Sequence, residues 1–173
     1  GGTIQVESKL GEGTTFVVEI PMEILSVDGM ENQDQTDQKN SEMQLQGKRV
    51  LIAEDNDLNA EILETLLQDR GIQYVRAENG KEALDLFAAR PEGSFDAILM
   101  DIMMPEMDGY EATRRIRSMK DRPDGEKIPI IAMTANAFAE DMQASLAAGM
   151  NAHLTKPIEI DSLMRTISNQ LKK

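Results

Sequence analysis

The sequence predicts an α/β fold built on a parallel sheet that helices cover on both faces. Between residues 47 and 173, five short apolar runs alternate with five longer amphipathic stretches. The apolar runs are almost continuous in Val, Ile, Leu, Ala and Met, which is typical of strands buried on both faces. A regular alternation of strand and helix indicates βαβ units, in which each helix crosses over and the next strand runs in the same direction.

The five expected strands fall at residues 50–53, 74–75, 97–100, 128–133 and 152–155. The second is the shortest, so we expect it at an edge of the sheet. Each expected helix follows one strand and carries apolar residues at helical spacing. In chain order, the predicted buried faces are Leu58, Ile62, Leu63, Leu66 and Leu67; Ala83, Leu84, Phe87 and Ala88; Tyr110, Thr113 and Ile116; Met142, Leu146 and Ala147; and Leu163, Met164, Ile167 and Leu171.

Several residues are suited to begin or end these helices. Asn79 is a suitable N-cap for the second helix, and Asp55 or Asn56 would cap the first. Gly71 and Pro91 follow the first and second apolar stripes, where they would end the helices.

The first 46 residues differ from the rest of the chain. Apolar and polar residues alternate at 4–6 and 16–20 around a turn containing Gly11 and Gly13, which predicts a β-hairpin over residues 1–21. Residues 22–46 hold six acidic residues against one lysine and show little periodicity, so we expect a flexible acidic linker. The remaining residues, 47–173, would then form the α/β domain.

Composition excludes several classes of function. Eighteen Lys and Arg against 31 Asp and Glu give a net charge of −13, which argues against a nucleic-acid partner. The chain has no cysteine, which excludes disulfides, thiolate zinc sites and cysteine nucleophiles, and one histidine cannot form a multi-His metal site. No apolar run approaches the roughly 20 residues of a membrane helix. We therefore expect a cytoplasmic chain without membrane contact and, since it begins with Gly, a piece of a longer protein.

Reactive side chains follow four of the expected strands. Glu54 and Asp55 follow the first strand, Asp101 follows the third, Thr134 ends the fourth and Lys156 follows the fifth. Parallel strands place their carboxyl ends at one edge of the sheet, where open α/β sheets bind ligands. Each residue taken alone is more often a solvated loop residue or a helix cap than a ligand, but their joint placement predicts one shared site.

The residue types at this edge are suited to phosphate chemistry. Three neighbouring carboxylates repel one another unless a cation is present or one is protonated. Oxygen ligands without His or Cys suit Mg²⁺. Lys156 and Thr134 would then neutralise and hydrogen-bond phosphoryl oxygens, and Asp101 would act as a nucleophile that forms an acyl phosphate.

Four segments resemble the response-regulator receiver domain. They are VLIAEDN at residues 50–56, MDIMMPEMDG at 100–109, AMTA at 132–135 and LTKP at 154–157, and the resemblance extends over residues 47–173. It implies a flavodoxin-like five-stranded parallel sheet with strand order 2-1-3-4-5. It also implies a cis peptide bond between Lys156 and Pro157.

The resemblance assigns roles to these residues. Asp101 would be the phosphoacceptor, taking a phosphoryl group from a phosphohistidine. Asp55, Asp101 and the main-chain carbonyl of Met103 would bind Mg²⁺, with Glu54 assisting through water. Glu54 stands where an Asp is common in the family, so its contact is less direct.

The resemblance also implies a conformational switch. Thr134 and Lys156 would hold the phosphoryl oxygens, and phosphorylation would draw Thr134 inward. The face formed by the fourth helix, fifth strand and last helix would shift with it. His153 occupies the usual aromatic switch position. We expect a half-buried strand residue there, with a pH-sensitive switch as the alternative.

Residues 1–21 contain GGTI at 1–4, Ser8, GEGTTF at 11–16 and Ile20-Pro21. With these residues the segment resembles the last two strands of a histidine-kinase ATP-binding domain. Together the segments imply a hybrid sensor histidine kinase, expected to be a homodimer, with any membrane anchor upstream. The donor would be a phosphohistidine domain of this parent and the next acceptor a histidine phosphotransfer protein or domain. This fragment lacks the ATP-binding boxes and the phosphorylated His, so it would catalyse only its own phosphorylation and dephosphorylation.

Three alternative functions make different demands on these residues. A haloacid-dehalogenase-like phosphatase needs a second Asp two positions after the nucleophile, where Met103 stands. A flavin-binding electron carrier needs an anion-binding loop after the first strand, where Glu54, Asp55 and Asp57 would repel a phosphate. The remaining alternative is a silent receiver-like interaction module that is not phosphorylated.

Overall fold

The chain forms two compact units. The computed structural model describes residues 2–9, 11, 13–19, 45–135 and 139–172. The units are residues 1–35 and 36–173. In the described parts of both, no helix is long and apolar enough to cross a membrane.

The N-terminal unit contains the predicted hairpin. Strands β1 (Thr3–Lys9) and β2 (Gly13–Glu19) pair antiparallel, and every residue of both strands is exposed. Ile4 pairs with Val18 and Val6 with Phe16, so the larger apolar side chains share one face.

Most of the predicted linker, residues 22–46, lies outside the described residues. Leu45, which the sequence analysis assigned to that linker, is almost fully buried and packs in the core of the second unit.

The second unit is a five-stranded parallel sheet, and its predicted strand order is confirmed. The strands are β3 (Arg49–Ala53), β4 (Gln73–Ala77), β5 (Ala97–Asp101), β6 (Ile130–Thr134) and β7 (Ala152–Thr155). Their order in the sheet is β4-β3-β5-β6-β7, with all neighbours parallel. Strand β4 lies at an edge, as its short apolar run predicts.

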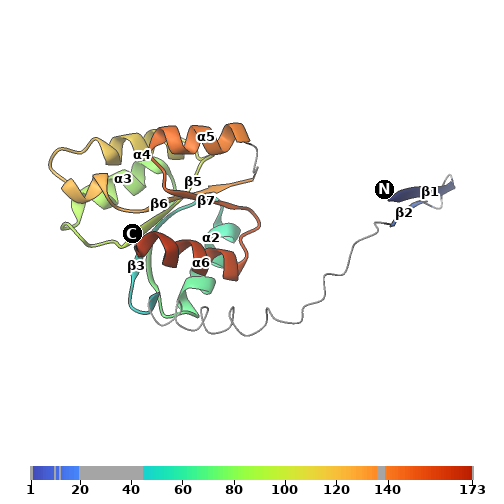
Figure 1. The fold of residues 1–173 in the computed structure, drawn as a ribbon, viewed down its shortest axis with the longest axis horizontal. Coiled ribbons are helices and arrows are strands. Elements are labelled where there is room, and N and C mark those ends of the chain that lie inside the picture. Colours follow the sequence, from blue (N-terminus) through green and yellow to red (C-terminus); the bar gives the residue numbers. More distant parts are fainter. Residues whose placement is uncertain (1, 10, 12, 20–44, 136–138, 173) are drawn as a thin grey trace. The chain divides into compact units, whose positions relative to one another are not determined.

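Helices cover both faces of this sheet (Figure 1). They are α2 (Asp57–Gln68), α3 (Gly80–Ala89), α4 (Gly109–Arg117), α5 (Ala139–Ala148) and α6 (Ile160–Leu171), with a short 3₁₀ turn, η1 (Pro123–Glu126). On one face, Phe87 of α3 and Ile116 of α4 pack in an aliphatic core. On the other, Leu63 of α2 and Leu163 of α6 do the same.

The N-caps show how local sequence places these helices. The side chains of Asn56, Asn79 and Asp108 accept hydrogen bonds from the main-chain N–H groups three residues later, at 3.1, 2.8 and 2.7 Å. Each bond satisfies one of the N–H groups left unpaired at a helix start. Asn79 was predicted as a cap, and of the two candidates for α2 the structure selects Asn56.

Three predicted helix faces are partly wrong: Ala88, predicted on the buried face of α3, is exposed, and parts of the α2 and α5 faces are exposed as well. Leu58 and Ile62 of α2 are 66% and 47% exposed, whereas Leu63 and Leu67 are buried as predicted. Leu58 and Ile62 lie roughly opposite the buried Ala60 on a helix of 3.6 residues per turn, so they cannot meet the sheet with it.

The prediction for α5 fails for the same reason. Leu146 and Ala147 are exposed, and the buried residues of the helix's last two turns are Ser145 and Ala148. Apolar residues were therefore assigned to a face that points to solvent.

Strand β6 begins two residues later than predicted. The N–H of Ile128 donates to the carbonyl of Asp124 at 2.8 Å, which commits it to the preceding turn. Pro129 has no N–H to donate, although its carbonyl accepts from Ile98 at 2.8 Å. Regular pairing therefore starts at Ile130.

Arg114 and Arg115 of α4 are exposed to solvent, whereas Arg117 on the same helix binds other parts of the domain. It donates to the carbonyls of Gly149 and Gly125 and to Oδ1 of Asn151, at 2.9, 2.6 and 2.7 Å. The end of α4 is thereby fixed to the segment that leads into β7.

Gly109 allows α4 to approach the end of β5. A Cβ on Gly109 would lie 2.2 Å from the carbonyl oxygen of Asp101. We expect Gly109→Ala to lower the free energy of unfolding by about 2 kcal/mol, because a main-chain atom must move. In the control Gly93→Ala, the added Cβ meets open space and only the positive φ costs stability, about 1 kcal/mol. Urea unfolding of both variants measures the difference, and equal losses would contradict the steric argument.

Candidate functional site

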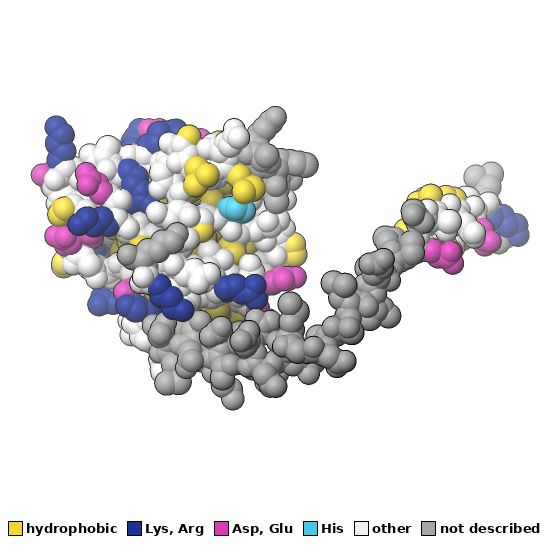
Figure 2. All heavy atoms as spheres, in the orientation of Figure 1, with side chains coloured by type: hydrophobic (Ala, Val, Ile, Leu, Met, Phe, Trp, Pro, Cys, Tyr) yellow, Lys and Arg dark blue, Asp and Glu magenta, His cyan; other side chains and the backbone are white. Residues whose placement is uncertain are grey.

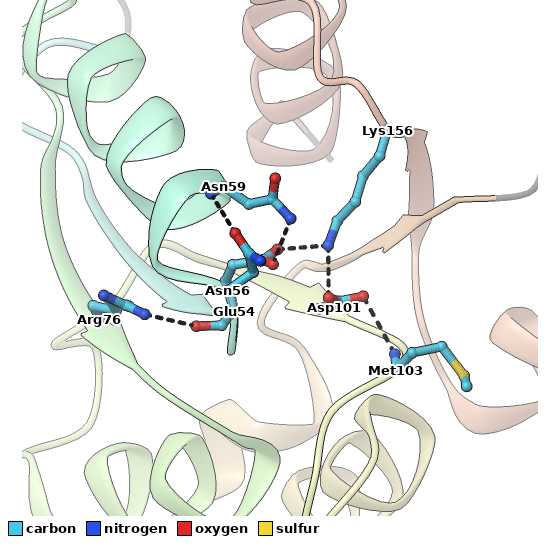
Figure 3. A network of polar contacts seen from close by, with 7 residues as sticks. All are labelled: Glu54, Asn56, Asn59, Arg76, Asp101, Met103 and Lys156. Atoms are coloured by element: carbon cyan, nitrogen blue, oxygen red, sulfur yellow. Dashed lines mark hydrogen bonds and ion pairs between the residues drawn. The ribbon is translucent and has the colours of Figure 1, made fainter.

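The carboxyl edge of the sheet brings together four of the predicted site residues. Glu54 and Asp55 follow β3, Asp101 ends β5 and Lys156 follows β7. Figure 3 shows the side chains of Glu54, Asp101 and Lys156 pointing toward one another from these separate strands. The peptide bond between Lys156 and Pro157 is cis, as the resemblance implied.

Lys156 forms ion pairs with two buried carboxylates. Its Nζ lies 2.6 Å from Oε2 of Glu54 and 2.6 Å from Oδ2 of Asp101. The Glu54 side chain is 0% exposed, that of Asp101 is 9% exposed and that of Lys156 is 19% exposed. One ammonium therefore faces two carboxylates, so the buried group keeps an excess of negative charge.

The second oxygen of each carboxylate also accepts a hydrogen bond. Nδ2 of Asn59 donates to Oε1 of Glu54 at 2.9 Å, and the main-chain N–H of Met103 donates to Oδ1 of Asp101 at 3.2 Å. Every oxygen of the two buried carboxylates thus has a donor, as burial of charged groups requires.

Burial changes the acid–base properties of this group. It raises the pKa of Asp101 above the usual aspartate range, and the neighbouring Lys156 offsets this only in part. Burial alone would lower the pKa of Lys156. The hydrogen bonds and charges of Asp101 and Glu54 outweigh that effect and raise the pKa above the usual lysine range.

Three carboxylates are placed to hold a cation. One oxygen from each of Glu54, Asp55 and Asp101 lies within 4.8 Å of the other two. Glu54 and Asp101 are buried and Asp55 is exposed, so the group opens to solvent on one side. An oxygen-only donor set with excess negative charge fits Mg²⁺.

Thr134 lies at the carboxyl end of β6, beside this group. Its carbonyl accepts the main-chain N–H of Lys156 at 2.8 Å, and the residue before it, Met133, is the pairing partner of Asp101.

His153, expected to be half-buried, is exposed on β7 and lines a hollow of about 360 Å³ together with Met142, Leu146 and Met150. In Figure 2 the histidine (cyan) lies beside hydrophobic side chains.

Asn59 and Arg76 also contact the site, although the sequence pattern did not predict them there. Nη2 of Arg76, on edge strand β4, donates to Oδ1 of Asp57 at 2.6 Å and to the main-chain carbonyl of Glu54 at 3.4 Å. Arg76 therefore supports the loop that carries Glu54 and Asp55. A charged residue between the apolar strand residues Val75 and Ala77 was the available signal for Arg76. For Asn59, the signal was an amide one helical turn beyond Asn56.

Exposed apolar side chains lie on the segments that directly follow Asp55 and Asp101. Leu58, Ile62 and Met103 are 66%, 47% and 80% exposed. A small hollow of about 80 Å³ beside Glu54 and Lys156 is lined by Ile62 and Pro157, among others. Exposed apolar residues next to a polar site are typical of a surface that binds another protein.

The raised pKa of Asp101 predicts that Asp101→Asn stabilises the fold in EDTA at pH 7. Because the pKa of Asp101 is raised in the folded state, protonation of this carboxyl favours folding. That contribution to the free energy of unfolding is fully present below the ordinary Asp pKa of about 3.9, and it is lost as pH rises through the folded-state pKa. The ionised carboxylate therefore costs stability at pH 7, and Lys156 keeps Glu54 as a partner in the variant. We expect a gain of about 1 kcal/mol that disappears below about pH 4.

Asp124 provides a control of opposite sign. Its pairing with the buried Arg122, at 2.8 Å, holds the pKa of Asp124 below the usual range. The stability that ionised Asp124 gains from Arg122 is present above the ordinary Asp pKa and is lost as pH falls through the lowered folded-state pKa. Asp124→Asn should therefore lower the free energy of unfolding at pH 7 by about 1–3 kcal/mol. Urea unfolding at several pH values measures both variants. If both lose stability at pH 7, the account of Asp101 is wrong.

Comparisons with known proteins match this domain in sequence and in structure. The response regulator receiver domain model matches residues 50–168. Hybrid signal transduction histidine kinase I of Dictyostelium discoideum is 41% identical over 128 residues, which are 73% of this chain and 7% of that protein. The chain spans between 7% and 15% of the length of the curated relatives it matches.

Solved structures agree with the family match. The receiver domain of a sensor histidine kinase from Pseudomonas aeruginosa, solved with a magnesium ion in its active-site cleft, is 36% identical with a TM-score of 0.66, covering 73% of this chain and 99% of that one. A chain of the co-crystal of the Saccharomyces cerevisiae histidine phosphotransfer protein Ypd1 with the receiver domain of Ssk1 is 32% identical with a TM-score of 0.66, covering 73% and 90%. With this fold and this acidic edge, the chain belongs to the response regulator receiver domain family.

Proposed function

We propose that this domain acts in phosphorelay signal transduction by accepting a phosphoryl group on Asp101 from a phosphohistidine. The observation that carries the proposal is the contact of Asp101 Oδ2 with Lys156 Nζ at 2.6 Å, beside two further carboxylates at the carboxyl edge of the sheet. Family membership supports this assignment.

The chemistry follows from the side chains at this edge. A carboxylate oxygen of Asp101 would attack phosphorus, a P–O bond would form and the P–N bond to the donor imidazole would break, leaving an acyl phosphate. Lys156 would neutralise a phosphoryl oxygen, since its Nζ already contacts the attacking carboxylate. The hydroxyl of Thr134, at the end of the neighbouring strand, would donate to another.

Mg²⁺ is the cofactor that this donor set fits. Asp55, Asp101 and the carbonyl of Met103 would hold it, with Glu54 acting through water. When bound, it would neutralise the charge of the phosphoryl oxygens. The repulsion among the three carboxylates supports this assignment, since a cation would relieve it.

The exposed residues Leu58, Ile62 and Met103 would form the surface that a phosphohistidine partner contacts, because they lie on the segments that directly follow Asp55 and Asp101. The partners would be the phosphohistidine domain of a parent kinase and a histidine phosphotransfer protein or domain.

The parent would be a hybrid sensor histidine kinase and a homodimer. Residues 1–21 would then be the end of its ATP-binding domain, 22–46 a linker and 47–173 the receiver. The relatives named as hybrid kinases support this context.

Incubation with acetyl phosphate and Mg²⁺ tests the acceptor. Intact mass should increase by one phosphoryl group in the wild type and in the control Asp85→Asn, whose exposed carboxylate pairs with Lys81 on α3. Asp101→Asn should gain nothing, and hydroxylamine should remove the group, as expected for an acyl phosphate. A wild type that gains no mass, and whose spectra do not respond to beryllofluoride, would instead be a silent interaction module.

Mg²⁺ should raise the melting temperature, because it binds the folded state and relieves repulsion there. Binding at 100 times Kd stabilises by about 2.7 kcal/mol. Asp101→Asn should lose most of this gain, whereas Asp85→Asn should keep it. Differential scanning calorimetry in EDTA and in Mg²⁺ measures both, and an equal gain in Asp101→Asn would remove Asp101 from the metal site.

A further inference from the structure

We propose that Asn59 is a positioning residue of the acidic site, which fixes the carboxylate of Glu54 for cation binding. The carboxamide of Asn59 donates from Nδ2 to Oε1 of Glu54 at 2.9 Å, inside a group where Glu54 is fully buried (Figure 3). The inference rests on the proposed function and concerns the geometry of the same site.

Glu54 needs such a partner because its side chain is one methylene longer than aspartate. The last torsion of a glutamate is broad, so burial alone does not fix the plane of its carboxylate. Here the two oxygens bind donors from different elements: Asn59 of α2 holds Oε1, and Lys156 after β7 holds Oε2. Two donors from separate elements set the rotation of the carboxylate.

Lys156 is shared between Glu54 and Asp101, so it cannot by itself fix the carboxylate of Glu54. The same Nζ contacts Oε2 of Glu54 and Oδ2 of Asp101 at equal distances of 2.6 Å. A phosphoryl group on Asp101 would compete for this ammonium. Asn59 contacts neither Asp101 nor Lys156 in any described hydrogen bond, so its contact with Glu54 does not depend on where the ammonium goes.

The backbone holds Asn59 in place independently of the site. Its N–H donates to Oδ1 of Asn56, the N-cap of α2, at 3.1 Å, and the next residue, Ala60, is fully buried against the core. The Asn59 side chain is itself half-buried. Its amide is thus directed at Glu54 from a fixed helix turn.

Titration calorimetry with Mg²⁺ tests this role. Asn59→Leu keeps the side-chain size but removes the donor, and we expect Mg²⁺ to bind about tenfold more weakly, the scale found for residues that orient metal ligands. The control Asn79→Ala removes an asparagine at the start of α3, where it caps that helix and makes no described contact with the acidic site, so it should lower the melting temperature and leave Mg²⁺ affinity unchanged.

A double-mutant cycle separates positioning from a general structural role. In a Glu54→Ala background, Asn59→Leu should change Mg²⁺ affinity by less than about twofold, because the group through which Asn59 acts is absent. Unchanged affinity in the single variant, or equal weakening in both backgrounds, would overturn the proposal.

Magnetic resonance of the wild type provides a measurement that does not depend on a variant folding. The Asn59 side-chain amide signals should shift in step with Mg²⁺ binding, and signals that do not move would also overturn the inference. A wild type that fails to bind Mg²⁺ would refute the proposed metal site itself. Normal binding by both the wild type and Asn59→Leu would refute only the role of Asn59.

Discussion

The site depends on one ammonium group that lies between two buried carboxylates. Lys156 is 102 residues from Glu54 and 55 from Asp101 in the chain, yet its Nζ contacts both at 2.6 Å. Two buried carboxylates without a counter-charge would be costly, so their burial depends on the ends of β3, β5 and β7 lying together. Lys156 does not neutralise the whole group, because Asp55 adds a third carboxylate on the solvent side. The remaining negative charge is what makes the edge suitable for a cation.

The packing around this edge keeps the charged groups at fixed positions. The strands that carry them are buried on both faces by aliphatic residues. In such a close-packed core, substitutions that change side-chain volume even slightly are poorly tolerated. Gly109 lets α4 begin directly against the main chain of Asp101, and the N-caps Asn56 and Asp108 define where the neighbouring helices start. The loops that carry the reactive groups are therefore short and bounded by rigid elements, which is the usual arrangement of sites at the carboxyl edge of a parallel sheet.

The parts of the site that lie at strand ends could be predicted from the sequence, because parallel topology alone brings those ends together. The strand order came from the family resemblance, and the structure shows it. The exposed sides of α2 and α5 could not be read from composition: Leu58 and Leu146 are apolar, but the helix rotation that decides their burial depends on the sheet beneath. Asn59 and Arg117 were missed for a related reason. Their importance lies in contacts with Glu54 and Gly149, which depend on three-dimensional placement and leave no periodic pattern.

The contacts of Arg117 have a mechanical consequence for the half of the sheet formed by β6 and β7. Arg117 binds Asn151, and Oδ1 of Asn151 also accepts the N–H of Ile130 at 2.8 Å, so the amino ends of both strands are joined to α4. Thr134 and Lys156 lie at the other ends of these strands. The contacts of Arg117 therefore anchor the amino ends of β6 and β7, at the end of each strand opposite Thr134 and Lys156.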